Sequence, residues 1–153
     1  MASPDAPWMK DLAESSAALR EVLGAIIRAE RQYQSASPLE LLHQISNDAR
    51  WSWLRPLYQL IADIDHATAD DELPASEVAA IGAHARALLS GIGAPIEHAF
   101  LERYRVLLQD EPSVAMAHGS ALRALRKLPP EPESEAERLH AHHQWVMRRK
   151  HQR

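Results

Sequence analysis

The chain contains no cysteine. Composition alone therefore excludes disulfide bonds, thiol catalysis, iron–sulfur clusters and zinc–thiolate sites. Long apolar runs are also missing, because stretches such as residues 23–27 are far too short to cross a bilayer. The first residues show no basic segment followed by an apolar stretch, so no signal peptide is expected. These absences predict a protein that is not inserted in a membrane and that resides in the cytoplasm.

Strong charge of either sign is absent as well. The net charge is −4 with a pI near 6.1, which is too mild for a protein that coats nucleic acid. The 153 residues are 46% hydrophobic, which is enough to form the core of one globular domain. Frequent alanine, and arginine in preference to lysine, indicates a GC-rich bacterial genome.

No run of alternating apolar residues indicates a β-strand. The strongest helix formers dominate instead, so the predicted fold is an all-α bundle of five to six helices, with a C-terminal helix on a proline-rich tether. Apolar residues recur at steps of three and four positions in each predicted helix. Helices are expected at about residues 7–33, 74–90, 95–108 and 112–127. The segment between residues 38 and 67 is expected to form one or two further helices.

Pro56 leaves two interpretations of the segment between residues 38 and 67. Ser37, Pro38 and Glu40 together form a strong helix start signal. If one helix runs straight on from Pro38, Pro56 must kink it, at a cost of roughly 3 kcal/mol. If a new helix starts near Trp53, Pro56 falls in its first turn and costs little.

The composition changes after residue 128. Residues 129–133, Pro-Pro-Glu-Pro-Glu, predict a stiff and extended linker between a bundle of residues 1–128 and a last helix of residues 134–153. Ser134 and Glu137 form a capping box at the start of that helix. Its charge changes from acidic to basic along its length, which suits the helix dipole.

Two of the four tryptophans lie in one short run, residues 50–58. Arginine stacks on tryptophan and presents a planar fork to carboxylate or phosphate groups. A small anionic ligand or an acidic partner is therefore one interpretation of this run, through Arg50, Trp51, Trp53, Arg55 and Tyr58. The other is that the aromatic residues form the packing centre of the bundle, while the two arginines pair with Asp48, Asp63 or Asp65.

Nine histidines favour a second kind of site. Three of them follow an acidic residue by three positions, which places both side chains on one helix face: Glu40–His43, Asp63–His66 and Glu137–His140. Di-iron carboxylate bundles use this pairing, and such ligands suit iron or manganese. The candidate ligands are His43, Asp63, His66, Glu97 and His98. Against a metal site, Glu40 and Glu137 already act as capping residues, and chance pairs at this spacing are expected in a helical chain.

The last helix ends in a basic cluster beside a tryptophan. Trp145, Arg148, Arg149 and Lys150 are candidates for an interaction arm that contacts nucleic acid, an anionic membrane surface or an acidic protein. The simpler interpretation is that Leu139, Trp145 and Val146 dock the helix on the bundle or on a second subunit.

No catalytic motif is found, and Gly91-Ile92-Gly93-Ala94 lacks the features of a phosphate loop. The sequence therefore predicts a non-catalytic helical interaction or regulatory protein that binds a protein partner, with a homodimer as the expected assembly and no bound cofactor. The alternatives are a metal-binding bundle, with or without enzymatic activity, and weak nucleic-acid binding through the C-terminal arm.

Overall fold

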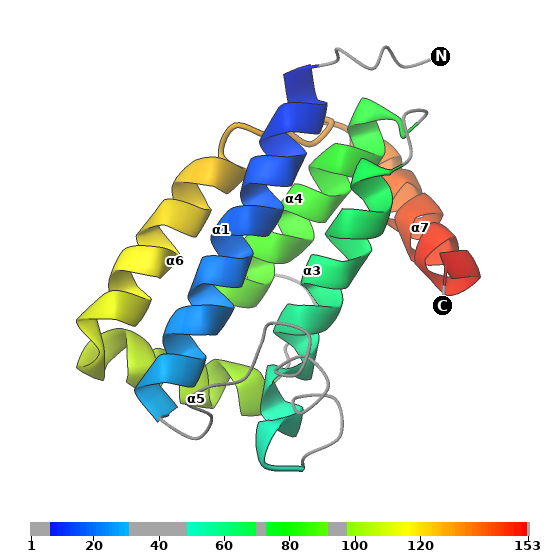
Figure 1. Cartoon of the computed structure of the whole chain (residues 1–153). Coiled ribbons are helices and arrows are strands. Elements are labelled where there is room, and N and C mark those ends of the chain that lie inside the picture. The colour runs from blue at the N-terminus through cyan, green and yellow to red at the C-terminus, as the bar shows by residue number, and fades with distance from the viewer. Residues whose placement is uncertain (1–6, 31–48, 70–72, 92–97, 153) are drawn as a thin grey trace.

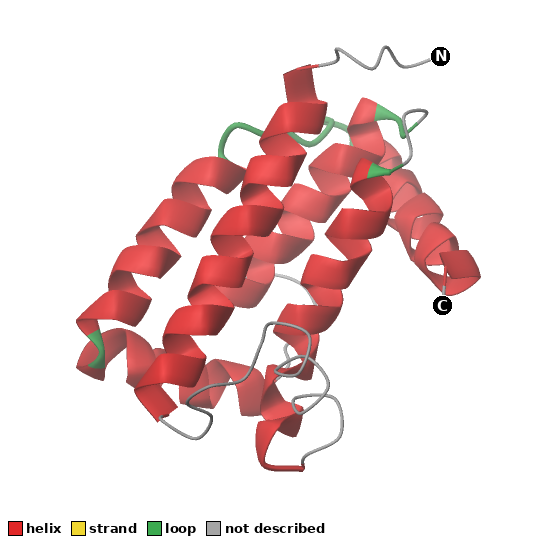
Figure 2. Ribbon diagram, viewed as in Figure 1, coloured by secondary structure: helices red, strands yellow, loops and turns green. Residues whose placement is uncertain are grey.

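The computed structural model describes residues 7–30, 49–69, 73–91 and 98–152. Throughout these ranges the chain consists of helices and their connections, with no strand, which confirms the prediction of an all-α bundle (Figure 2). The helix start predicted at Ser37 and Pro38 lies outside the described residues. No helix in the described ranges is both long enough and apolar enough to cross a membrane.

Four helices lie side by side and enclose the core (Figure 1). Among them α1 packs along both α6 and α3, and α4 contacts all three. The helix α5 crosses the base of the bundle, where it meets α6 and the short 3-10 helix η1. The last helix, α7, lies at one edge and packs against α4. The elements are α1 (Pro7–Glu30), η1 (Ala49–Leu54), α3 (Arg55–Thr68), α4 (Ala75–Ser90), α5 (His98–Asp110), α6 (Pro112–Leu125) and α7 (Glu135–Gln152).

Pro56 lies in the first turn of α3, which begins at Arg55 after the 3-10 turn of η1. Proline is tolerated there because the backbone N–H groups of the first helical turn have no partner within the helix. This confirms the interpretation in which a new helix begins in the aromatic run. The helix α6 begins in the same way, with Pro112 in its first turn.

Gly91 ends α4 in the left-handed conformation, with φ of 73°, and its N–H donates to the carbonyl of Ala87 at 2.7 Å. A β-carbon at this position would come within 2.7 Å of Leu101 Cδ2. The backbone conformation thus favours glycine, and a β-carbon would in addition displace the Leu101 side chain of α5.

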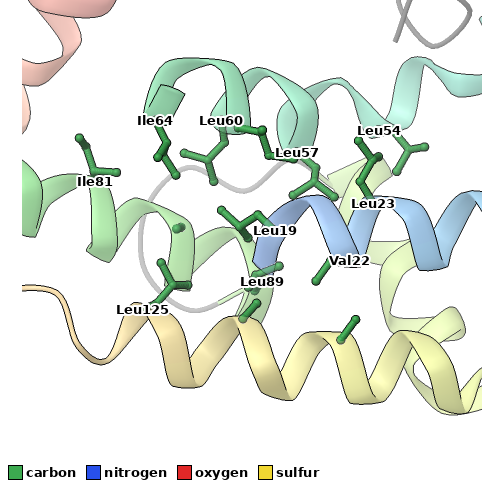
Figure 3. Close-up of a cluster of buried hydrophobic side chains, with 14 of the residues drawn as sticks. Leu19, Val22, Leu23, Leu54, Leu57, Leu60, Ile64, Ile81, Leu89 and Leu125 are labelled. Atoms are coloured by element: carbon green, nitrogen blue, oxygen red, sulfur yellow. The ribbon is translucent and has the colours of Figure 1, made fainter. Parts of the chain in front are cut away.

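The core lies between the four long helices (Figure 3). Leu19 from α1, Leu57 and Ile64 from α3, Ile81 from α4 and Leu125 from α6 are all completely buried. Trp51 and Leu54 of η1 extend this core toward α5, and Trp51 is only 2% exposed. The aromatic run therefore contributes to the packing of the bundle, as one of its two interpretations predicts.

Candidate functional site at the C-terminal helix

The start of α7 is fixed by contacts with the proline-rich segment before it. Ser134 Oγ accepts a hydrogen bond from the backbone N–H of Glu137 at 3.4 Å, as expected of the predicted N-cap. Arg138 donates to the carbonyl oxygens of Pro132 and Glu133, at 2.9 and 2.6 Å. His142 Nε2 lies 3.0 Å from a carboxylate oxygen of Glu131. The segment is thus tied to the helix by side chains from the first two turns of α7.

The two faces of α7 differ sharply in exposure. The inner face is formed by residues three and four positions apart: Arg138, Ala141, His142, Trp145, Arg148 and Arg149, of which Ala141 and Trp145 are 4% and 2% exposed. The outer face carries Leu139, Val146 and Met147, which are 64%, 39% and 40% exposed.

The sequence predicts that Leu139, Trp145 and Val146 dock α7 on the bundle or on a second subunit, and of these three only Trp145 is buried within the bundle. At 100° per residue, the other two side chains point roughly 100–120° away from Trp145 around the helix axis. A single helix face cannot include all three.

The first of two buried ion pairs joins α7 to the start of α4. The Glu77 carboxylate is buried, and Arg148 from α7 reaches both of its oxygens, with Nε at 2.7 Å and Nη2 at 3.3 Å. This fork-to-fork geometry is the strongest form of an arginine–carboxylate contact. It holds the end of α7 against the first turn of α4.

The second ion pair joins α7 to α3. Asp63 is 3% exposed and lies 2.8 Å from Nε of Arg149. The guanidinium of Arg149 also lies over the ring of Trp145, at 4.6 Å from the ring centre. A buried carboxylate costs a great deal of solvation energy, which only a well-placed partner offsets. Docking of α7 therefore supplies part of the compensation for burying Asp63.

His84 of α4 completes the contact with Trp145. The two ring centres are 5.1 Å apart, and the rings meet edge to face at 71°. The pKa of His84 is lowered from 6.5 to about 4, mainly by burial and also by the nearby Arg149 and His142, against the opposing charge of Asp63. His84 is therefore neutral at neutral pH, which suits a ring packed against an indole and a guanidinium.

The lowered pKa of His84 predicts that α7 docking weakens in acid. The docked form resists protonation while the released form protonates near pH 6.5, so docking loses free energy as the pH falls from about 6.5 toward 4 and is unaffected above that range. Hydrogen exchange of α7 at pH 7.5 and 5.0, corrected for intrinsic rates, measures this change. His84→Leu should reduce the pH dependence because it removes the imidazole that protonates on release. The variant retains Asp63, Glu77 and His142, so the difference between the two proteins isolates the effect of His84. Equal loss of protection in both proteins would show that His84 is not its source.

The described side chains of the aromatic run differ widely in exposure. Trp51 is buried, Trp53 and Tyr58 are half-buried and Arg55 is exposed, while the side chain of Arg50 lies outside the described residues. A guanidinium does lie 5.4 Å from the centre of the Trp53 ring, but it belongs to Arg103 of α5. The binding role suggested for these residues remains a prediction.

Of the carboxylates considered as partners for Arg50 and Arg55, Asp48 lies outside the described residues, and Asp63 and Asp65 have other partners. Asp63 binds Arg149, as described above. Asp65 binds Arg20 and accepts a hydrogen bond of 2.6 Å from the hydroxyl of Ser16, which is buried on α1. These contacts link α3 to α7 on one side and to α1 on the other.

A buried tyrosine and a histidine form a further polar contact between α5 and α6. Tyr104 Oη lies 2.7 Å from Nδ1 of His118, and Tyr104 is stacked on Phe100 with ring centres 5.1 Å apart. Burial raises the pKa of Tyr104 and lowers that of His118, so a neutral phenol shares a hydrogen bond with a neutral imidazole. This contact satisfies both polar groups and packs α5 against α6.

The proposed metal ligands are only partly described. His43 and Glu97 lie outside the described residues, as does the side chain of His98. Asp63 is buried against Arg149, and His66, three positions later, is exposed. Within the described ranges, no three histidine, aspartate or glutamate side chains gather closely enough to hold a metal ion. Metal binding therefore stays a prediction, tested by metal analysis of the protein and its His43→Ala and His66→Ala variants.

A shallow groove of about 580 Å³ runs between α1 and α6. Arg20 and Arg28 lie on its α1 side, and Ser113 and Ser120 on its α6 side. Arg20 is committed to Asp65, and Arg28 folds back so that a β-carbon at Gly24 would lie 3.2 Å from its Nη1. The groove therefore offers few fixed hydrogen-bond donors to an anion. The inner face of α7, with its two ion pairs, is the better candidate for a site among the described residues.

Comparison with protein-family models, with curated proteins and with solved structures finds no match to this chain. Its function must therefore be argued from its own residues. The predicted arm residues Trp145, Arg148 and Arg149 face the bundle, whereas Lys150 is exposed.

The sequence predicts Asp63 as a metal ligand or as a partner of Arg50 or Arg55, not as a partner of the arm, and Glu77 was not predicted at all. Asp63 lies on the apolar face of α3 among Leu60, Ile64 and Ala67, and Glu77 immediately precedes the buried Val78 on α4. A charged residue within an apolar helix face is the signal that could have identified Asp63, because buried charges need partners. No local signal indicates that those partners come from the last helix.

Proposed function

We propose that this chain is a non-catalytic helical interaction protein that binds a protein partner through the outer face of α7. The proposal rests on the difference between the two faces of this helix: one is docked on the bundle and the other is exposed. Trp145, Arg148 and Arg149 hold the inner face on α3 and α4, while Leu139 and Val146 face solvent.

Docking makes α7 a better binding surface than a free helix. An isolated helix of this length is only marginally stable in water and must be ordered on binding. Two ion pairs and a buried tryptophan already fix α7 in place. The entropy cost of ordering the helix is therefore met when the chain folds and does not weaken binding of a partner. Amphipathic helix faces of this kind are recognised by apolar grooves or by other helices.

The same contacts favour a protein partner over nucleic acid. Nucleic-acid binding requires several cations that can reach phosphate groups. Arg148 and Arg149 are turned toward Glu77 and Asp63, and their side chains are only 32% and 21% exposed. Lys150 is exposed, but Glu135 and Glu137 are exposed near the start of the same helix.

Site-specific photo-crosslinking in the native cell tests the proposal. A photoreactive amino acid is placed at Val146, and at Met116 on α6 as a matched control, since Met116 is an exposed apolar residue at 74%. We expect a discrete protein adduct from position 146 and none from position 116. Leu139→Glu should reduce the adduct at position 146 by about tenfold, because it places a charge in the apolar contact.

Equal labelling from positions 146 and 116, or an adduct that is insensitive to Leu139→Glu, would contradict the proposed role of α7. The mass of the adduct also reports the partner. An adduct of twice the mass of the chain indicates a second copy, and any other mass indicates a different protein.

A further inference from the structure

Resting on the proposed function, we infer that the partner is a second copy of this chain, and that the two α7 helices pack antiparallel about a twofold axis at His143. The inference is carried by the spacing, the symmetry and the charge of the outer face of α7. Figure 1 shows that this helix lies at one edge of the bundle.

The outer face has the spacing of a short coiled-coil seam. Ala136, Leu139, His143, Val146 and Lys150 follow one another at steps of three, four, three and four residues, and all five are exposed. This alternation keeps a row of side chains facing a partner helix. The inner face uses the same helix independently, through Trp145 and the two arginines, so both contacts can exist together.

The seam is nearly symmetric about its midpoint. Turning a second copy end to end places Leu139 within one residue of the level of Val146 of the second copy, and Lys150 against Ala136 of the second copy. His143 then lies opposite the same residue of its mate. A surface that matches itself in this way closes into a dimer and leaves no open end for further growth.

Charge favours the antiparallel arrangement over the parallel one. Glu135 and Glu137 are exposed in the first turns of α7, and Lys150 is exposed near its end. Antiparallel pairing brings each acidic end beside the basic end of the mate. Parallel pairing would place like charges together at both ends, which is unfavourable.

The absence of cysteine makes disulfide trapping a clean test. In the antiparallel dimer, cysteines at position 143 lie opposite each other, within the reach of a disulfide. Cysteines at position 139 are offset by eight residues, or about 12 Å along the axis, which is beyond that reach. In a glutathione buffer we expect His143→Cys to form disulfide dimers at least tenfold more readily than Leu139→Cys. Mixing Leu139→Cys with Val146→Cys should give the mixed dimer.

Met116→Cys on α6 measures the background from random collision, since this position is exposed but lies outside α7. Crosslinking of Leu139→Cys as readily as His143→Cys would overturn the antiparallel arrangement. Crosslinking of His143→Cys no faster than Met116→Cys would overturn the dimer through α7.

Sedimentation equilibrium of the full chain without introduced cysteine provides the second measurement. The contact is short, so concentrations up to about 0.5 mM are required to populate a weak dimer. We expect concentration-dependent dimerisation that Val146→Glu reduces at least tenfold and Met116→Glu leaves unchanged. His143→Leu should strengthen it by completing the apolar seam.

The failure of this inference is distinguishable from the failure of the proposed function. A chain that stays monomeric up to 0.5 mM, together with a photo-adduct of different mass from position 146, refutes the second copy and retains α7 as a binding surface. A monomeric chain with no specific adduct from position 146 refutes both.

Discussion

Trp145→Ala is expected to release α7 from the bundle while the four-helix core stays folded. Trp145 is 2% exposed and lies against His84 of α4 and under the guanidinium of Arg149. Truncating a buried tryptophan typically costs about 3–5 kcal/mol. This loss falls on a helix that lies at one edge of the molecule and packs mainly on α4 (Figure 1). Release lets Asp63 and Glu77 regain water, so undocking is favoured over unfolding of the whole bundle.

Thiol labelling measures this release directly. Ala141→Cys places a single thiol on the inner face of α7, at a position that is 4% exposed in the docked helix. In this background, Trp145→Ala should accelerate labelling by at least tenfold and leave most of the helical circular dichroism intact. Met147→Ala, on the outer face of the same helix, is the matched control and should not change the rate in dilute solution. Unchanged labelling after Trp145→Ala would contradict the role given to this residue.

Arg149→Met is expected to destabilise the protein by about 3–5 kcal/mol, since it leaves Asp63 buried without its arginine. The cost is limited by the free energy of docking, because undocking of α7 exposes Asp63 to water. Asp63→Leu should cost less than Arg149→Met, as the Arg149 side chain is 21% exposed and can turn toward solvent, whereas that of Asp63 is 3% exposed. The double variant Asp63→Leu/Arg149→Met should recover most of the stability, because a buried ion pair is often replaceable by apolar residues.

Urea unfolding of the two single variants and the double variant gives the coupling between them. We expect a coupling free energy of more than about 1 kcal/mol, as is typical of residues in direct contact. The exposed pair of Lys127 and Glu14, whose charged atoms are 3.2 Å apart, is the matched control. Its coupling should stay below about 1 kcal/mol, because solvent screens an exposed pair. Equal coupling for the two pairs would show that burial of Asp63 does not set the strength of its contact.

The local features of the fold were predictable because they depend on neighbouring residues. Pro56 at the start of α3, Gly91 at the end of α4 and Ser134 before α7 each act through a backbone group a few positions away. The apolar periodicity of the helices is equally local, and it predicted the all-α class.

The organisation of the candidate site was not predictable in the same way. Sequence analysis identified Trp145, Arg148 and Arg149 as an interaction arm, and Asp63 as a possible metal ligand. The contact between Glu77 and Arg148 spans 71 residues, so no local spacing reveals it. The orientation of α7 depends on where α3 and α4 place their buried carboxylates, and this is a property of the packed bundle.

The central claim is that the inner face of α7 is docked on α3 and α4, while its outer face is exposed and available to a partner. The most direct test compares thiol labelling of Ala141→Cys with that of Leu139→Cys, each in an otherwise unchanged chain and at a dilution where the protein is monomeric. The two positions are two residues apart in sequence, but Ala141 is 4% exposed and Leu139 is 64% exposed. We predict that Leu139→Cys reacts at least tenfold faster than Ala141→Cys. Equal rates would mean that α7 is not docked, and faster reaction at position 141 would mean that the helix docks by the opposite face.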